Sequence, residues 1–411
     1  MRSSSKSEGT TTKSKTGESK LTDLLKFSIA YYFTNSLQWS ILFYLPIAMK
    51  LKGFSPHQIG FATAMFPFAT LILSIPSGII NDRASTKTTT LLSLIILSLF
   101  SFLTSFLVKA DQGNSPLPWY IDSFTGGLGA ALLLVSSRSW FYKRFQGEKA
   151  RYFTLFHIGG FLGFASGPMF TSILRNSISS GETFQIVGLL YIVPFAIYAS
   201  AKGIPYHAIS LKEYLKGFSN PTALPLLFLS FVQGTHFGTE RAVYSLFLKS
   251  GLGFPLQAVS AVYSVVGLSL TFSTLLSGYF MDKKPKSSLN FLIWGIFFSG
   301  VFQTMTGLTN HFTDVAIVRM LHTLGDGASI LATSVVFSRI FPRISMGGSY
   351  GGVRFLQTIG MMLGAQIAGS LYAIHFRLPF YVNGATMMAT SVLTWVWVVS
   401  KLKKLNRKKE G

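Results

Sequence analysis

Apolar runs of roughly 20 residues recur along almost the whole chain, with short polar segments between them, which indicates transmembrane helices. Only 12% of the residues are charged and 49% are hydrophobic. A soluble domain carries about 25% charged residues. We therefore expect an all-α membrane protein with twelve transmembrane helices, at residues 24–49, 57–80, 88–108, 118–142, 151–173, 183–201, 222–248, 256–280, 288–309, 312–338, 347–373 and 379–400.

The two ends of the chain differ from this apolar body. Residues 1–22 are rich in Ser, Thr, Lys and Gly, and we expect a disordered cytoplasmic tail there and no signal peptide. Residues 402–411 form a basic cytoplasmic tail. We expect this basic run to be a stop-transfer flank of the last helix. The alternative is that it binds lipid headgroups.

The placement of the basic residues predicts how the chain lies in the membrane. The net charge is +22, and most of the 36 Lys and Arg fall in the tails and in alternate loops, on one side of the predicted helices. This bias is typical of the cytoplasmic side, so both termini are expected there, in a cell membrane. The charge is thus a topology signal, and we expect no nucleic-acid partner.

A duplicated motif divides the chain near its midpoint. Gly78 and Asp82-Arg83 are repeated as Gly278 and Asp282-Lys283, each time at the end of an apolar run. Internal membrane repeats are typical of secondary transporters. We expect two six-helix halves at residues 23–201 and 222–401, joined by a cytoplasmic linker at residues 202–221.

These two loops resemble a motif of the major facilitator superfamily, and the resemblance covers the chain from about Leu24 to Lys401. That family has Gly-x-x-x-Asp-Arg/Lys-x-Gly-Arg-Lys between its second and third helices. Ser85, Thr86 and Pro285 depart from the pattern. The resemblance implies two pseudo-symmetric bundles that rock around a central site. It also implies a cytoplasmic gate at the repeated motif, made of Gly78, Asp82, Arg83, Gly278, Asp282 and Lys283.

The gate role also has a physical basis. Gly78 would let another helix approach closely. Asp82 is placed where a carboxylate can meet the N-terminus of a helix from the opposite half. The alternative is a plain basic loop on the inner side of the membrane.

Glycines repeat along the fifth and eleventh predicted helices. Gly159, Gly163 and Gly167-Pro168 share one stretch, and Gly360 and Gly364 share the other. Small residues at this spacing allow close helix packing, and Pro168 removes a helix hydrogen bond. The first stretch is similar to a pattern of antiporters in the family, which favours an exporter, although importers also need such faces.

Charged and titratable residues inside the predicted helices are functional candidates, because such groups are costly in a bilayer. The helices at residues 88–108, 183–201, 288–309 and 379–400 have none within their apolar parts, and the family places these four on the outside. Arg138 and Arg354 lie near the cytoplasmic ends of their helices, where we expect them to reach toward the membrane surface.

Two groups of these residues predict a proton-coupling site in the second half. His236 and Glu240 share one helix face, and Arg319, His322 and Asp326 share another. Asp326 is the first candidate for the coupling proton and Glu240 the second, with His322 and His236 beside them. Arg319 and Arg241 would be counter-charges or clamps for a substrate carboxylate. The alternative is a static ion-pair network that fixes helix packing.

Further polar residues are candidates for the substrate cavity. The whole set is Arg319, Arg241, Asn35, Gln38, Asp122, His157 and Gln357. Asp122 stands before Gly126 where the family often has an Arg, so the family's Arg relay is not carried over to this chain.

The function expected from these features is secondary transport of a small solute, coupled to protons, with export by antiport as the preferred direction. A facilitated-diffusion importer, a proton symporter, or a transporter-like sensor or scaffold are the alternatives. The chain has no Gly-x-x-x-x-Gly-Lys-Ser/Thr loop for ATP and no Cys. We therefore expect no enzyme, no cofactor and no metal site, and a monomer whose partners are its substrate, protons and the lipid bilayer.

Overall fold

The structure, a computed structural model, describes residues 8–54, 56–110, 115–175, 177–204, 212, 218–219, 223–284 and 287–410. Side chains are described between Lys20 and Ser400, apart from those at positions 47, 50, 56, 57, 256 and 399. Within these residues the fold is helical and contains no strand. Most of the predicted linker at residues 202–221 lies outside the described residues.

The N-terminal half consists of α1 (Glu8–Leu51), α2 (Pro56–Arg83), α3 (Thr86–Lys109), α4 (Leu117–Phe145), α5 (Ala150–Arg175), α6 (Ser180–Leu190) and α7 (Ile192–Ser200). The C-terminal half consists of α9 (Ala223–Leu246), the π-helical turn η1 (Phe247–Gly251), α10 (Leu256–Lys283), α11 (Ser288–Thr306), α12 (Phe312–Ile340), the 3-10 turn η3 (Arg343–Ser345), α13 (Met346–Ile374) and α14 (Leu378–Glu410).

Helices α6 and α7 are two parts of one span. Their boundary lies at Tyr191, three residues before Pro194. The proline lacks an N–H and its ring clashes with the carbonyl four residues earlier, which interrupts the helix there. Counted in this way, the described part of the chain contains twelve spans, six in each half, as predicted.

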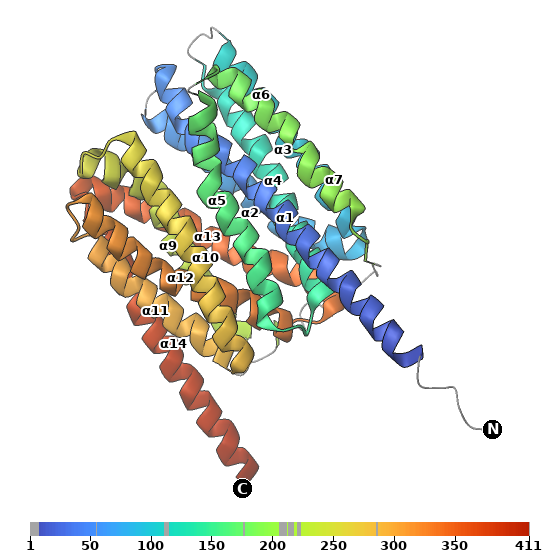
Figure 1. Cartoon of the computed structure of the whole chain (residues 1–411). Coiled ribbons are helices and arrows are strands. Elements are labelled where there is room, and N and C mark those ends of the chain that lie inside the picture. The colour runs from blue at the N-terminus through green and yellow to red at the C-terminus, as the bar shows by residue number, and fades with distance from the viewer. Residues whose placement is uncertain are drawn as a thin grey trace.

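The outermost helices are longer than the sequence predicted. Helix α1 begins at Glu8, inside the stretch expected to be disordered, and α14 continues to Glu410. Extending an existing helix costs far less than starting one, so a polar flank can continue the helix of the adjoining span. Both extensions leave the same end of the molecule (Figure 1).

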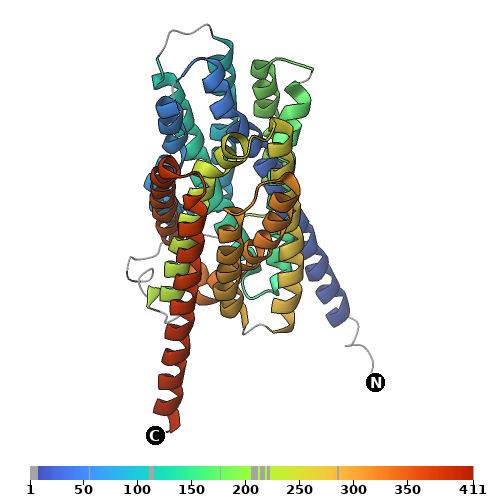
Figure 2. The ribbon, with the colours of Figure 1, turned by 90° about the vertical axis from the view of Figure 1, so that its left-hand side faces the viewer.

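The two halves repeat one packing scheme (Figures 1 and 2). In the N-terminal half α1 packs against α5, and α4 packs against α2 and α3. In the C-terminal half α9 packs against α13, and α12 packs against α10 and α11 in the same way. The halves meet through α5 against α10 and α2 against α13. The predicted fold of two pseudo-symmetric six-helix bundles is therefore confirmed.

Glycines make the tightest helix contacts within each half. A Cβ at Gly163 of α5 would overlap the backbone oxygen of Tyr32 on α1, and Gly159 and Gly167 are equally crowded against α1. The α9–α13 pair of the C-terminal half is packed in the same way, because a Cβ at Gly364 of α13 would overlap the backbone oxygen of Thr235 on α9. Gly360 is crowded against α9 as well, and Pro168 is buried beside Gly167.

Helix α3 shows how the molecule meets lipid. It exposes Leu92, Ile95 and Leu99, while Thr90 and Ser93 are buried against the bundle. This arrangement, with polar residues inside and apolar residues outside, is the reverse of a soluble helix and matches a hydrocarbon solvent.

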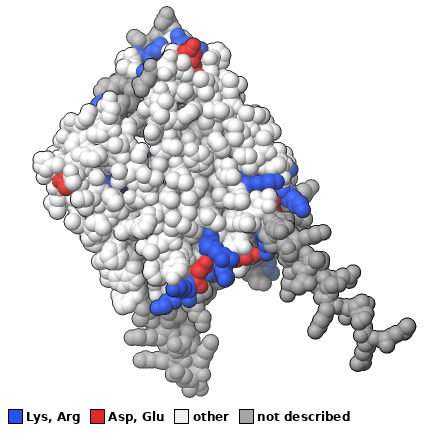
Figure 3. All heavy atoms as spheres, viewed as in Figure 1, with Lys and Arg blue, Asp and Glu red and all other residues white. Residues whose placement is uncertain are grey.

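Seven helices of the described chain are long and apolar enough to cross a membrane by length and composition alone. In Figure 3 charged side chains gather mainly at the end from which the termini leave, with a smaller group at the opposite end and a nearly uncharged surface between. That band fits a bilayer around the twelve spans.

Candidate functional site

A cavity of about 190 Å³ lies between the halves, with walls from α1, α2, α4, α9 and α13. Its lining includes Asn35, Gln38 and Arg241, three of the predicted cavity residues. Arg138 of α4 and Arg354 of α13 also line it. The expectation that these two arginines reach toward the membrane surface is therefore wrong, because their helices turn them into the space between the halves.

The three arginines of the cavity have neutral partners. Arg138 donates hydrogen bonds to the hydroxyls of Tyr350 (3.0 Å) and Tyr31 (2.7 Å). Arg354 donates to Gln357 Oε1 at 2.6 Å. Arg241 lies over the ring of Trp39, 5.7 Å from its centroid. Across the described residues, none of these guanidinium groups forms an ion pair with a carboxylate.

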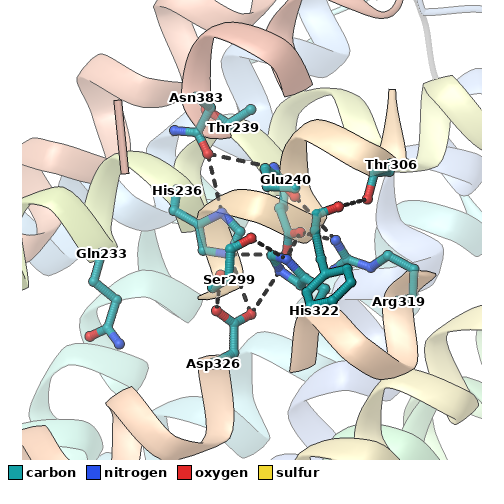
Figure 4. Close-up of polar contacts among 12 residues, drawn as sticks. Gln233, His236, Thr239, Glu240, Ser299, Thr306, Arg319, His322, Asp326 and Asn383 are labelled. Atoms are coloured by element: carbon teal, nitrogen blue, oxygen red, sulfur yellow. Dashed lines mark hydrogen bonds and ion pairs between the residues drawn. The ribbon is translucent and has the colours of Figure 1, made fainter. Parts of the chain in front are cut away.

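A second polar site lies inside the C-terminal half (Figure 4). His236 and Glu240 of α9 meet Arg319, His322 and Asp326 of α12. His236 and His322 are fully buried, Arg319 is 1% exposed and Asp326 is 5% exposed. The two helix faces that the sequence predicted thus face each other, and we call these five residues the α9–α12 cluster.

Two imidazoles and two carboxylates are in direct contact in the α9–α12 cluster. Nε2 of His322 lies 3.0 Å from Asp326 Oδ2 and 3.4 Å from Glu240 Oε1. Nε2 of His236 lies 3.3 Å from the same Asp326 oxygen and 3.8 Å from Glu240 Oε2. Arg319 pairs with Glu240.

Helix α11 fixes the orientation of the cluster from the outside. The hydroxyl of Ser299 donates to Asp326 Oδ1 at 2.6 Å. The backbone carbonyl of Ser299 lies 2.9 Å from Nδ1 of His322. A carbonyl can only accept, so Nδ1 of His322 carries a hydrogen and the Nε2 atom is the one that faces the carboxylates. Helix α14 adds a further contact, because Oδ1 of Asn383 lies 3.2 Å from Nδ1 of His236.

The cluster has the composition of a cation site. Ligand atoms of His236, Glu240, His322 and Asp326 all lie within 4.8 Å of one another. However, Arg319 already pairs with Glu240, and its guanidinium stacks on Tyr244 with 4.4 Å to the ring centroid. A fixed positive charge at this point disfavours a divalent cation, and the same groups are well suited to hold protons.

A chain of hydrogen bonds connects the cavity to the cluster. Arg354 donates to Gln357, whose Nε2 donates to Gln233 Oε1 at 3.1 Å. Gln233 then donates to Ser329 Oγ at 2.9 Å, and Ser329 donates to the backbone carbonyl of Asp326 at 2.9 Å. Gln233 was missed by the sequence analysis, although it lies three residues before His236 and on the same helix face.

Four of the predicted cavity residues do not line the cavity. Asp122 is buried against α3 and accepts a hydrogen bond from Thr104 at 2.8 Å. His157 contacts Ser334 Oγ at 2.8 Å, in the interface between the halves. Arg319 belongs to the α9–α12 cluster. Gln357 accepts a hydrogen bond from Arg354, which lines the cavity in its place. The position of a residue along a predicted helix does not tell which way its side chain points around the helix axis.

The repeated motif lies at the end of the molecule that carries the termini. Asp82, at the end of α2, accepts hydrogen bonds from the backbone N–H groups of Gly347 (2.9 Å) and Gly348 (2.7 Å) at the start of α13. Lys143 Nζ lies 2.6 Å from the same carboxylate. Gly78 allows this approach, because a Cβ there would lie 2.5 Å from the oxygen of Gly347.

The second copy of the motif makes the equivalent contact with the other half. Asp282, at the end of α10, accepts from the N–H groups of Ala150 (2.5 Å) and Arg151 (3.4 Å) at the start of α5. A Cβ at Gly278 would overlap the Thr154 hydroxyl. Lys283 instead lies over Tyr279, 4.3 Å from its ring centroid. Arg83 is exposed at the end of α2.

Comparison with known proteins agrees with this architecture. The sequence matches the Major Facilitator Superfamily over residues 28–293 and again over residues 226–411. Quinolone resistance protein NorA of Staphylococcus aureus (strain COL) is 23% identical over 367 residues, which cover 86% of this chain and 90% of that protein. Multidrug resistance protein 2 of Bacillus subtilis (strain 168) is 23% identical over 385 residues, covering 87% and 90%.

Solved structures share the fold. The human organic anion transporter MFSD10 superposes with a TM-score of 0.75 at 12% identity, over 91% of this chain and 99% of that chain. The proton:xylose symporter XylE gives a TM-score of 0.72 at 11% identity, over 93% and 96%. The chain belongs to the major facilitator superfamily and is a multi-pass membrane transporter.

Proposed function

We propose that this protein is a proton-coupled antiporter that exports a small organic solute across the cell membrane, with the coupling proton held in the α9–α12 cluster. The observation that carries the proposal is the contact of His322 with Asp326 and Glu240 inside the C-terminal half. In this proposal the protein acts as a monomer, since one chain supplies the whole cavity, and both termini are cytoplasmic.

The hydrogen-bond donors of His322 imply a proton at this point. Nδ1 of His322 donates to the carbonyl of Ser299. In a neutral imidazole the Nε2 atom would then present a lone pair to Asp326 at 3.0 Å. Two acceptors at this distance repel each other, so in our proposal a proton lies on Nε2 or on Asp326 and makes this contact favourable. The site therefore has a reason to take up a proton and several atoms among which to pass it.

Arg319 gives the cluster two alternative charge states. With no proton, Asp326 and Glu240 are two buried carboxylates and Arg319 balances one of them. With one proton bound, the remaining negative charge is balanced by Arg319 and the cluster is neutral. Such a difference in buried charge is large enough to favour different arrangements of the two halves.

The same contacts also suit a static network, in which the ion pairs only hold α9 and α12 together. The link through Gln233 and Gln357 to the cavity favours coupling, because a network needed only for packing has no need to reach the substrate space. Transport by the variant Asp326→Asn separates the two possibilities.

Export is favoured by the names of the relatives, which are a quinolone resistance protein and a multidrug resistance protein. In our proposal Asp82 and Asp282 act as the cytoplasmic gate, with Gly78 and Gly278 permitting the contact and Arg83 and Lys283 flanking it. The structure has its clearest polar contacts between the halves at this end, so the proposed gate is closed here.

The test is transport in proteoliposomes with an imposed pH gradient. Three probes of different charge would be used, namely norfloxacin, ethidium and 2-naphthoate. In Asp326→Asn we expect the gradient to drive no accumulation, while exchange of probe against probe stays within about threefold of the wild type, because an amide holds the packing but carries no exchangeable charge.

Asp314→Asn is the matched control. Asp314 lies on the same helix but at its exposed start, where it accepts hydrogen bonds from Asn310 and His311 (2.7 Å each). Its variant should keep gradient-driven flux. Accumulation by Asp326→Asn at the wild-type rate would refute the coupling role. Flux that ignores the gradient in the wild type would favour facilitated diffusion.

A further inference from the structure

We propose that the central cavity binds an organic anion, a carboxylate-type group on an aromatic or apolar body, held between Arg138 of one half and Arg241 and Arg354 of the other. As a statement about the transported substrate this rests on the proposed function, but the binding site itself does not depend on it.

The cavity has an unbalanced positive charge. Three of its lining residues are arginines and none is an Asp or Glu. The charged and titratable groups that interact with Arg138, Arg241 and Arg354 are these arginines themselves, tyrosines and His157, and no carboxylate is among them. Arg354 is close enough to the other two arginines to interact electrostatically with both. Three like charges thus line one cavity at membrane depth, and an anion bound among them would lower their repulsion.

Arg319 shows how an arginine with a carboxylate partner is held in this protein. It pairs with Glu240, and it donates to Gln303 Oε1 at 3.3 Å. The three arginines of the cavity have tyrosine hydroxyls, an amide and an indole ring in the corresponding places. They therefore keep their charge available for a ligand.

Donor atoms of the cavity arginines remain unused. The Nε atoms of Arg138 and Arg354 are buried and have no hydrogen-bond partner in the described structure, as is also the case for Nε of Arg319, but only the first two belong to residues that line the cavity. A guanidinium can bind a carboxylate through two parallel N–H groups, and such bidentate contacts are the strongest hydrogen bonds that arginine makes. Arg241 is exposed where it lines the cavity, so a ligand can reach it.

The rest of the wall suits the organic part of such an anion. Tyr31, Trp39 and Phe66 supply aromatic surface, and Asn35 and Gln38 supply amide groups. Aromatic walls with a few placed polar groups are typical of sites for drug-sized ligands. A small inorganic anion would leave this aromatic surface unused, so we assign an organic anion.

The position of the arginines in the two halves gives the anion a mechanical effect. Arg138 belongs to the N-terminal half, and Arg241 and Arg354 belong to the C-terminal half. An anion that contacts Arg138 and Arg354 together attracts both halves to one point. The same ligand would thereby favour closure of the cavity around itself.

The test is equilibrium binding to the full-length protein in lipid nanodiscs without a pH gradient, measured by isothermal titration calorimetry. The probes are 2-naphthoate and indole-3-acetate, their neutral amides, and the cation 2-naphthylmethylammonium. We expect the carboxylates to bind at least about tenfold more tightly than their amides, and the cation to bind least, since a charge-assisted contact contributes roughly 1.5–3 kcal/mol.

The variants Arg241→Gln and Arg354→Gln should each weaken carboxylate binding about tenfold and leave amide binding within about twofold, while Arg241→Lys restores part of the loss. The control is Arg175→Gln, whose guanidinium is exposed at the end of α5 over the ring of Tyr44 and does not line the cavity. Comparing nanodiscs of zwitterionic and anionic lipid separates soluble anions from lipid phosphates. Competition by anionic lipid that abolishes carboxylate binding would assign the arginines to lipid and overturn the proposal.

Equal binding of carboxylates and amides, tighter binding of the cation, or no binding by either carboxylate would each overturn the proposal. These outcomes differ from a failure of the proposed function. If charge-selective binding is found but no probe is driven by a pH gradient, the anion site stands and the coupling fails. If the gradient drives probes without regard to their charge, the coupling stands and the anion site fails.

Discussion

At the scale of single residues, the α9–α12 cluster and the cavity differ in how well the sequence predicted them. The spacings His236–Glu240 and Arg319–His322–Asp326 each place side chains on one helix face, and the structure brings the two faces together. The prediction for Arg138 and Arg354 was wrong, since their position near helix ends suggested that they reach toward the membrane surface. Only the packing of α4 and α13 against the other half turns them inward.

Gln233 is the residue at which cavity and cluster are joined, so its loss should separate binding from coupling. It donates to Ser329 and accepts from Gln357. Gln233→Met keeps the volume but removes both contacts, each of which contributes about 1 kcal/mol. We expect gradient-driven flux in proteoliposomes to fall about tenfold, while 2-naphthoate affinity changes less than about twofold.

The matched control is Gln185→Met, which replaces a half-buried amide in the middle of α6 that accepts a hydrogen bond from Lys109, away from both cavity and cluster. It should transport as the wild type does. A proportional loss of binding and flux in Gln233→Met would show that this residue serves the cavity alone.

At the scale of secondary structure, the sequence predicted the helices themselves better than it predicted which helices pack against one another. Twelve apolar stretches became twelve spans, since in lipid the backbone must form its hydrogen bonds within the helix. Which helices touch was not readable from hydropathy, because lipid-facing and buried residues are both apolar. Glycine spacing was the exception, as it identified the faces of α5 and α13 that pack closely.

Adding one methyl group to these glycine faces tests how tightly the helices are held. In Gly163→Ala the new Cβ would meet the backbone of Tyr32, which cannot rotate away as a side chain could. We expect the free energy of unfolding to fall by about 1–3 kcal/mol, measured by chemical denaturation in detergent. Gly364→Ala in the equivalent pair should cost a similar amount, because it meets the backbone of Thr235.

Gly369→Ala provides the comparison. It lies on α13 with no heavy atom within 4 Å of the added Cβ, so it should be neutral or slightly stabilising, since alanine favours a helix. Equal stability of all three variants would mean that the α1–α5 and α9–α13 contacts adapt without cost.

At the scale of the whole molecule, the two Asp contacts hold the halves together at the end that carries the termini. Gln146 adds hydrogen bonds there to the backbone oxygens of Ser338 (3.3 Å) and Phe341 (3.0 Å) across the same interface. The sequence predicted the place, the carboxylate and, for Asp82, the kind of partner, which is a helix start of the opposite half. That these helices are α13 and α5 became evident only in the structure.

Weakening one Asp contact should expose the interface behind it. The chain has no Cys, so a single cysteine reports its own accessibility. Ser338 is buried at this interface. In a Ser338→Cys background, Asp82→Asn should raise the rate of maleimide labelling on the order of tenfold, because an amide loses the charge that interacts with the start of α13 and with Lys143.

Asp23→Asn is the control for this experiment. Asp23 pairs with Arg144 at the same end of the molecule, but both residues belong to the N-terminal half. Its loss should leave labelling unchanged. Labelling that rises equally in both variants would point to general loosening and would contradict a gate at Asp82.

The two contacts have a consequence for how such a chain could arise. Each half contains an accepting carboxylate at the end of its second helix and a helix start with donating N–H groups at its fifth, and the carboxylate of one half meets the helix start of the other. A single half therefore carries a surface that is complementary to itself. Two separate copies could associate through the same pair of contacts about a twofold axis, so the fused chain keeps the interface of a symmetric dimer, while its arginines and its α9–α12 cluster have become specific to one place in the sequence.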